Sequence, residues 1–275
     1  MRPGRISARR SVFALFALLA LTLALSFLTV PVISVFTNTS PGELVSSLGE
    51  SSARDALWLS FRTSLIALLI IVVVGTPSAY LLATRSFRGR SVVMTLIELP
   101  LVMPPAVAGI ALLAALGPRG IIGGAIEDSG IQLVLETTGV IVALTFVASP
   151  FFLRQAQAAF SAIDPSLLDA SRTLGSGEGR TFLRVAVPSA RAGLSAGLAL
   201  AWGRALGEFG ATLMFAGSFQ GVTQTAPLAI FEQFTSEDGF TTALALSAVL
   251  IAASGAILLA VKLLAGSRTL SSRGV

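Results

Sequence analysis

The chain has 275 residues, of which 54% are hydrophobic and only 12% are charged, with a mean hydropathy of +0.85. Soluble domains carry about a quarter charged residues, so this composition indicates an integral membrane protein. The chain has no cysteine and no histidine, which excludes disulfides, thiolate metal sites, thiol catalysis and His-dependent triads. The net charge of +5 is almost all arginine, and in a membrane protein such an excess reflects topology and not nucleic-acid binding.

Six windows are long and apolar enough to span a membrane, which takes about 20 residues. We expect transmembrane helices at 12–36, 59–83, 91–116, 133–153, 192–217 and 241–265. The first run is longer than the about 7–15 residues of a signal-peptide core, so we expect a retained helix. Basic residues gather before the first window, after the second, after the fourth and at the end, whereas the alternate loops are acidic. The positive-inside rule then places both termini in the cytoplasm.

The third window contains "ELPLVMPPAVAG", with Pro100, Pro104 and Pro105 in one apolar stretch. A proline removes a helical hydrogen bond, and in a membrane the freed carbonyl must face protein or a water-filled cavity. Because Glu98 directly precedes the prolines, we favour a break that lines or adjoins a pore. A kink that only improves helix packing is the alternative.

The segment Ser161–Arg191, after the fourth window, predicts a helix–turn–helix on the cytoplasmic face. Asp164 followed by Pro165 is typical of a helix start, and Gly175 suits the left-handed residue that ends a helix. A second short helix is expected from about Glu178, and Pro188 either ends it or marks the start of the fifth span. A solvated loop with a basic rim is the alternative. The basic residues assigned to this loop are Arg154, Arg172, Arg180, Arg184 and Arg191.

The fifth window contains "WGRALGEFGATLMF", which carries Arg204 and Glu208 within an apolar run. A charge at the centre of a membrane helix costs about 2.5–3.5 kcal/mol on insertion scales. The two residues are one helical turn apart and can neutralise each other. The pair is then either purely structural, or it lines the translocation path or a dimer seam. Two small-residue steps that favour close helix packing are Gly193 with Gly197 and Gly203 with Gly207.

The loop resembles the signature of ABC-importer permeases: Glu-Ala-Ala, three residues, Gly, nine residues, Ile-x-Leu-Pro. Here Asp169-Ala170-Ser171, Gly175 and Val185-Ala186-Val187-Pro188 fit every spacing, with Asp for Glu, Ser for Ala, and Val for both Ile and Leu. In that family the loop is a coupling helix that docks into a separate ATP-binding subunit. The resemblance therefore implies a coupling role for Asp169, Ala170, Ser171, Gly175 and Pro188.

The stretches "LPLVMPPAVAG", "RALGEFGATLMFAG" and "TQTAPLAIF" are similar to the molybdate branch of these permeases, and the resemblance covers about 57–265. Ser218 and Ala226 depart from the asparagine and leucine expected there. The resemblance implies an all-α fold of the type I ABC-importer permease with six transmembrane helices. It also implies a homodimer, two cytoplasmic ATP-binding cassette subunits and an extracytoplasmic molybdate-binding protein.

The chain has no nucleotide machinery, because its only lysine, Lys262, follows Val261 and cannot complete a P-loop. We expect no cofactor on this chain, with ATP and Mg on the partner ATPase, no catalytic residue, no metal site and no nucleic-acid partner. The expected parts are 1–56, a cytoplasmic tail, first helix and outer loop; 57–265, the transmembrane domain with coupling loop 161–190; and 266–275, a cytoplasmic tail. The residues expected at the pore or in helix packing are Arg204, Glu208, Gly207, Pro104 and Pro105.

The predicted function is the membrane-embedded subunit of an ATP-driven molybdate importer in the cytoplasmic membrane, in contact with lipid. A sulfate, thiosulfate or tungstate permease is the first alternative, since all these cargoes are doubly charged tetrahedral oxyanions. A secondary transporter is the second, although only Glu98, Arg204 and Glu208 could couple ions in mid-membrane. An intramembrane enzyme is disfavoured by the lack of histidine and cysteine.

Overall fold

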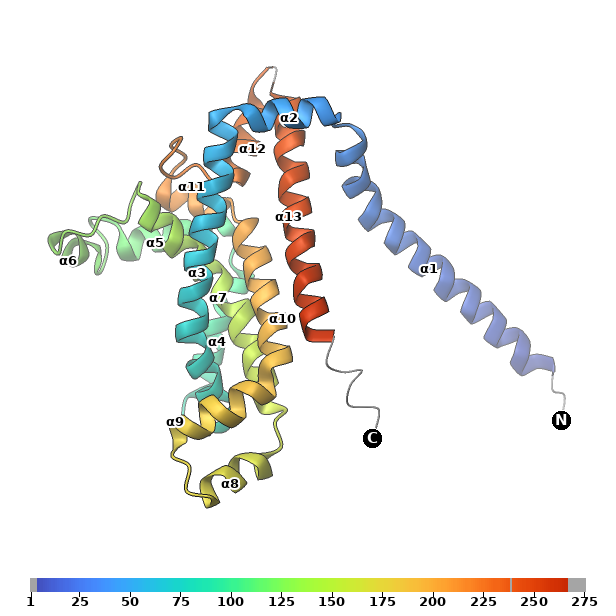
Figure 1. Ribbon diagram of the computed structural model, residues 1–275, viewed down its shortest axis with the longest axis vertical. Coiled ribbons are helices and arrows are strands. Elements are labelled where there is room, and N and C mark those ends of the chain that lie inside the picture. The colour runs from blue at the N-terminus through green and yellow to red at the C-terminus, as the bar shows by residue number, and fades with distance from the viewer. Residues whose placement is uncertain (1–3, 238, 267–275) are drawn as a thin grey trace.

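The computed structural model describes residues 4–237 and 239–266, and these form helices joined by loops (Figure 1). Residues 267–275, which make up nearly all of the expected cytoplasmic tail, lie outside the described residues. In chain order the elements are α1 (Gly4–Thr37), α2 (Pro41–Gly49), α3 (Ser51–Thr84), α4 (Arg90–Val102), α5 (Pro105–Leu116), α6 (Gly123–Asp128), α7 (Thr137–Ser161), α8 (Pro165–Thr173), α9 (Glu178–Thr181), a π-helical turn (Phe182–Ala186), α10 (Val187–Leu206), α11 (Gly210–Ala216), α12 (Ala226–Thr235) and α13 (Phe240–Gly266).

Four helical stretches are long and apolar enough to cross a membrane, at Phe13–Thr37, Ser51–Thr84, Thr137–Ser161 and Phe240–Val261. They correspond to the first, second, fourth and sixth windows. The other two windows are each divided, one into α4 and α5 and the other into α10 and α11. Six continuous spans are therefore not confirmed.

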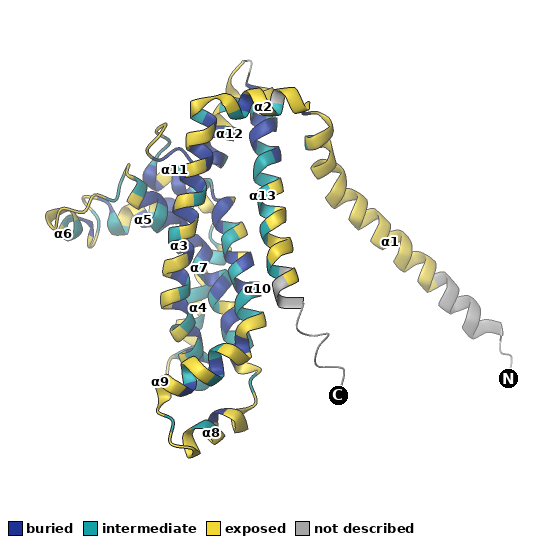
Figure 2. Cartoon of the chain, viewed as in Figure 1, coloured by how far each residue is buried: buried dark blue, intermediate teal, exposed yellow. Residues whose placement is uncertain are grey.

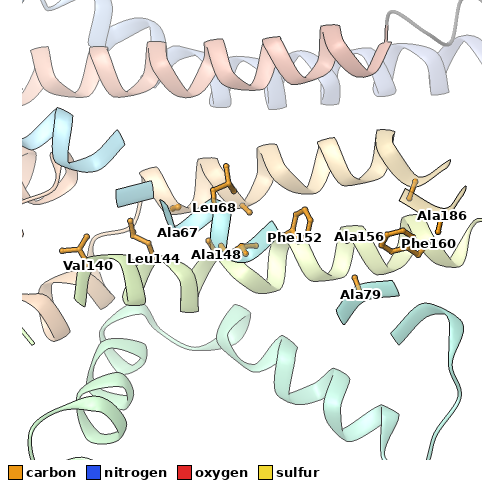
Figure 3. Packing of buried hydrophobic residues seen from close by; sticks show 14 of the residues in the cluster. Ala67, Leu68, Ala79, Val140, Leu144, Ala148, Phe152, Ala156, Phe160 and Ala186 are labelled. Carbon is orange, nitrogen blue, oxygen red and sulfur yellow. The ribbon is translucent and has the colours of Figure 1, made fainter. Parts of the chain in front are cut away.

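The main core lies between α3, α7 and α10 (Figure 3). Nine of its sixteen buried residues are alanine, and Phe152 and Phe160 are its large side chains. Lipid tails are as apolar as leucine, so helices in a bilayer associate through close packing of small residues and not through escape from water. Gly193 illustrates this closeness, because a Cβ added to it would lie 2.3 Å from the Cβ of Ala159 on α7.

The helix α1 lies apart from the bundle and approaches it only near its C-terminal end, where α2 crosses toward α3 (Figure 1). Its side chains from Phe13 to Ser34 are all exposed, whereas buried residues concentrate on α3, α7 and α10 (Figure 2). An apolar helix without protein cover is compatible with a lipid surrounding. At the opposite end of the bundle from α2 and α12 lie α8 and α9, so the predicted coupling loop projects from one end of the molecule.

Candidate functional site

The third predicted span is broken between α4 and α5. Met103 and Pro104 are extended, with φ/ψ of −72°/132° and −55°/136°, and Pro105 is the first residue of α5. A residue that precedes proline is driven out of the α region, and here this applies to both Met103 and Pro104 because two prolines follow one another. The proline break expected from the sequence is confirmed, while Pro100 lies within α4.

The fifth predicted span is also broken, and the expected continuous helix over 192–217 is wrong. The helix α10 ends at Leu206, α11 begins at Gly210, and Glu208 lies between them. Each glycine is about 1 kcal/mol less favourable than alanine inside a helix, so Gly207 and Gly210 weaken this stretch. The carboxylate of Glu208 then supplies a hydrogen bond that the first turn of a new helix needs.

Glu208 is the one charged side chain that is buried among the residues whose burial is described, with 1% exposed. One carboxylate oxygen accepts a hydrogen bond from the Ala211 N–H at 2.7 Å, and the other lies 2.5 Å from Nη2 of Arg204. The expected ion pair is therefore present, although Glu208 lies beyond the end of α10 and not on its face. The buried charge is compensated twice, by a helix N-terminus and by a guanidinium that is itself 25% exposed.

The two breaks lie next to each other, because α5 and α11 pack side by side (Figure 1). A Cβ added to Gly210 would lie 2.7 Å from the Cβ of Pro105, and one added to Gly109 would lie 2.6 Å from the Cβ of Met214. Only glycine fits at such distances. The short helices α5 and α11 thus form one close pair, with Pro105 and Glu208 at or just before their N-terminal ends. Gly207 is exposed and has no such close neighbour.

A second ion pair joins α4 to α7. Nη1 of Arg154 lies 3.3 Å from Oε1 of Glu98, and the side chains are 57% and 35% exposed. The sequence assigned Arg154 to the cytoplasmic loop, but it lies within α7, whose last residue is Ser161. Arg154 directly follows the apolar run 133–153 and lies four residues after Pro150, and this position was the overlooked signal that it belongs to the same helix.

The predicted helix of the cytoplasmic loop is confirmed as α8. Asp164 caps its start, because its carboxylate accepts a hydrogen bond from the backbone N–H of Ser166 at 2.9 Å. This hydrogen bond lowers the pKa of Asp164. At the other end Gly175 has φ +81°, the left-handed conformation expected from the sequence. Two hydrogen bonds close the C-terminus, from Gly175 N to Arg172 O at 2.9 Å and from Ser176 N to Ser171 O at 3.1 Å. This is a Schellman motif, so both ends of α8 are fixed.

Side-chain contacts hold α8 against the rest of the molecule. Leu168 is buried in the main core, and the hydroxyl of Ser171 lies 2.9 Å from that of the buried Thr181. Arg172 bonds Glu178 and Asp169, which raises the pKa of its guanidinium. Behind the loop, Tyr80, Phe160 and Phe182 pack their rings with centroids 5.0–6.3 Å apart, which links α3, α7 and the π-helical turn.

Pro188 does not end a helix but lies at the start of α10, which is the second of the two alternatives expected from the sequence. The helix runs from Glu178 through the π-helical turn into α10, and Pro188 is its second residue in α10. Proline has no N–H, so it cannot bond the carbonyl of Arg184, four residues earlier. The turn accommodates this, since the N–H of Val187 bonds the carbonyl of Phe182, five residues back. The predicted coupling loop is thereby continuous with the helix that carries Arg204.

The free surface of the loop combines apolar and charged groups. Leu174, Leu183 and Leu167 are 85%, 65% and 51% exposed, and Asp169 and Ala170 are exposed beside them. A rigid, capped helix with an uncovered leucine surface is suited to binding another protein. No group of three or more side chains placed to hold a metal ion occurs in the described part of the chain.

The chain matches known proteins in sequence and in fold. The family model of the binding-protein-dependent transport system inner membrane component matches residues 75–266. The probable transport system permease protein NifC of Clostridium pasteurianum is 34% identical over 261 residues, covering 94% of this chain and 91% of that one. The molybdenum transport system permease protein ModB of Mycobacterium bovis is 39% identical over 229 residues, covering 82% and 86%.

One solved structure, a bacterial alginate ABC transporter in complex with an alginate pentasaccharide-bound periplasmic protein, superimposes with a TM-score of 0.76 over the full length of both chains at 16% identity. That likeness supports the fold of an ABC-importer membrane subunit. With the family match over most of the chain, two broken helices and a capped loop of the expected spacing, this chain belongs to the family of binding-protein-dependent transport system inner membrane components.

Proposed function

We propose that this chain is the membrane subunit of an ATP-driven molybdate importer, working as a homodimer with two cytoplasmic ATPase subunits and an extracytoplasmic binding protein. The observation that carries the cargo is the 39% identity to a molybdenum permease. The loop geometry supports ATP as the energy source, because α8 is capped at both ends and carries exposed leucines that could bind an ATPase subunit. The basic loops support a topology with both termini in the cytoplasm.

Within this proposal α8 transmits the closure of the ATPases to the membrane. The residues Asp169, Ala170, Ser171, Gly175 and Pro188 shape the loop, as proposed from the sequence. The loop continues without interruption into α10, which ends four residues before Gly210 of α11. A rigid-body displacement of α8 would therefore be carried along α10 to the break at Glu208.

The two adjoining breaks are the proposed gate. Pro104 and Pro105 at one break, and Gly207 and Glu208 at the other, set where the helices change direction, and Arg204 offers a partly exposed guanidinium beside them. An intramembrane charge generally faces the bundle interior or a water-filled cavity and marks a substrate pathway. An arginine whose partner is buried behind it is suited to meet an anion first.

The cargo is tested by co-purification with the ATPase, followed by uptake of labelled molybdate into proteoliposomes that contain the complete importer and its binding protein. We expect ATP-dependent uptake that persists in excess sulfate. Uptake abolished by sulfate would assign the cargo to the sulfate alternative. Uptake that needs no ATPase would indicate a secondary transporter and contradict the proposal.

The coupling role is tested at Gly175, with Gly177 as the matched control. Both glycines are exposed, and a Cβ added to either meets nothing within 4 Å, but Gly175 has φ +81° while Gly177 has φ −66°. A left-handed residue with a side chain costs about 1–2 kcal/mol, so Gly175→Leu strains the end of α8 and Gly177→Leu does not. We expect Gly175→Leu to lower ATPase docking and uptake severalfold, and Gly177→Leu to change both little. Equal effects would mean that the conformation of Gly175 is not what matters.

A further inference from the structure

The ion pair between Arg154 and Glu98 joins the interiors of α7 and α4, away from the ends of both helices. At a rise of about 1.5 Å per residue, Arg154 is about 10 Å from Ser161 at the end of α7, and Glu98 is about 12 Å from Arg90 at the start of α4. Both of these helix ends adjoin the arginine-rich loops that the topology places in the cytoplasm. The pair therefore belongs to the cytoplasmic half of the membrane domain.

Within a single chain, other side chains do not enclose this pair. Arg154 is 57% exposed and Glu98 is 35% exposed, and no residue of α4 is buried. Exposure of a charged pair to lipid tails is costly, and ionisable residues in membrane segments generally face a water-filled cavity or the bundle interior. Because Arg154 is exposed and contact of its charge with lipid tails would be costly, we favour water on the exposed side of Arg154.

We propose that Arg154 is a second anion-binding point, on the cytoplasmic side of the helix breaks, for a doubly charged tetrahedral oxyanion leaving the membrane. The inference rests on the proposed import function. A guanidinium presents N–H groups in a planar fork that suits oxyanions. In this pair the arginine is the more exposed partner, as it also is in the pair of Arg204 and Glu208. An anion on the water side therefore meets the guanidinium before it meets the carboxylate.

Glu98 gives this point the weakness that transport needs. A site along a transport path must bind well enough to admit the ion and weakly enough to release it. At 3.3 Å from Arg154, the carboxylate competes with the passing anion for the same guanidinium. Beyond the pair, further exposed arginines lie on the loops that the topology places in the cytoplasm: Arg88, Arg180 and Arg184.

Water access is tested by cysteine labelling, for which the chain is suited because it contains no native cysteine. Arg154→Cys is compared with Val74→Cys, an apolar residue of α3 that is 60% exposed. The complete importer in proteoliposomes is treated with a charged, membrane-impermeant methanethiosulfonate from the cytoplasmic side. We expect the Arg154→Cys variant to be labelled and Val74→Cys to remain unlabelled. Molybdate and sulfate should each slow the labelling at position 154, and Glu98→Cys provides a second probe should Arg154→Cys fail to assemble.

Uptake separates an anion-binding point from a purely structural pair. Loss of a hydrogen bond to a charged group corresponds to about tenfold or more, so Arg154→Gln should lower turnover by about tenfold. Arg154→Lys keeps the positive charge without the planar fork and should therefore retain more turnover than Arg154→Gln. The double variant Arg154→Gln/Glu98→Gln should stay as slow as Arg154→Gln, because the guanidinium is still missing. Recovery in the double variant would identify a structural pair and overturn the inference.

Two further outcomes also decide the matter. Absence of labelling at positions 154 and 98, or labelling equal to that of Val74→Cys, would mean that no water path reaches the pair and would refute the inference. A wild-type importer that takes up no molybdate, but whose Arg154→Cys variant is labelled and protected by sulfate, would refute the proposed cargo and support the anion-binding point.

Discussion

The ion pair between Arg204 and Glu208, at the break of the fifth span, leads us to expect that losing the arginine destabilises the protein more than losing the glutamate. Replacement of Arg204 by glutamine leaves the Glu208 carboxylate, 1% exposed, without its cation. Breaking a buried pair in this way costs about 3–5 kcal/mol. Replacement of Glu208 by glutamine leaves a guanidinium that is 25% exposed, and the new side chain still offers an oxygen to the Ala211 N–H. Because Arg204 is partly exposed, we expect the smaller cost of about 1–2 kcal/mol.

The measurement is the thermal midpoint of the purified complex in detergent, followed by size-exclusion chromatography after heating. We expect Arg204→Gln to lower the midpoint more than Glu208→Gln does, and the double variant Arg204→Gln/Glu208→Gln to recover much of the loss, since no uncompensated charge remains. Glu208→Ala serves as the control for the helix cap, because it removes both the charge and the acceptor for Ala211. It should therefore be less stable than Glu208→Gln by about 1 kcal/mol.

Two results would refute this reasoning. If Glu208→Gln lost as much stability as Arg204→Gln, burial of the carboxylate would not be the source of the cost. If the double variant were no more stable than Arg204→Gln alone, the pair would not compensate charge in the folded protein. Uptake measured on the same variants separates stability from transport, because a stable double variant without uptake would assign the charged pair a role in the path.

Two further predictions concern packing and the coupling loop. A Cβ on Gly193 would lie 2.3 Å from that of Ala159, whereas one on Gly203 meets nothing within 4 Å. Gly193→Ala should therefore overpack the core and lower the free energy of unfolding by about 1–3 kcal/mol. An equally large loss with Gly203→Ala would contradict this prediction. The hydrogen bond from the Ser166 N–H lowers the pKa of Asp164. The carboxylate therefore contributes its full stabilisation of α8 at pH values above the ordinary pKa of 3.8, and this stabilisation is lost as the pH falls through the lowered pKa of the folded state. Hydrogen exchange of α8 amides, corrected for the intrinsic rate, should show this loss of protection in the wild type and not in Asp164→Asn. The same loss of protection in the variant as in the wild type would contradict the prediction.

The features that could be predicted from sequence are those that neighbouring residues determine. Asp164 with Pro165 and a glycine at position 175 encode both ends of α8 locally, and the structure has both. The paired prolines at 104 and 105 likewise act on the residues directly before them, so the first break was predictable. In each case the physical cause lies within a few residues of its effect.

The features that were missed depend on partners or on hydrogen bonds that hydropathy does not count. The apolar window 192–217 has enough hydrophobic residues for a span, but the hydropathy criterion ignores the Ala211 N–H that Glu208 caps within it. The pair of Arg154 with Glu98 joins helices far apart in the chain, and no local pattern relates them. The continuous helix through Pro188 depends on a π-helical turn that only the folded backbone reveals.

The polarity of the two ion pairs bears on which ions the protein could carry. In each pair the carboxylate is the less exposed member, at 1% against 25% for Glu208 and Arg204, and 35% against 57% for Glu98 and Arg154. Both pairs are neutral overall, so the cost of placing them in a membrane domain is reduced. In both pairs the guanidinium is therefore the member that an approaching ion reaches more readily. That arrangement favours an anion over a cation, which a pair with its carboxylate more exposed would not do.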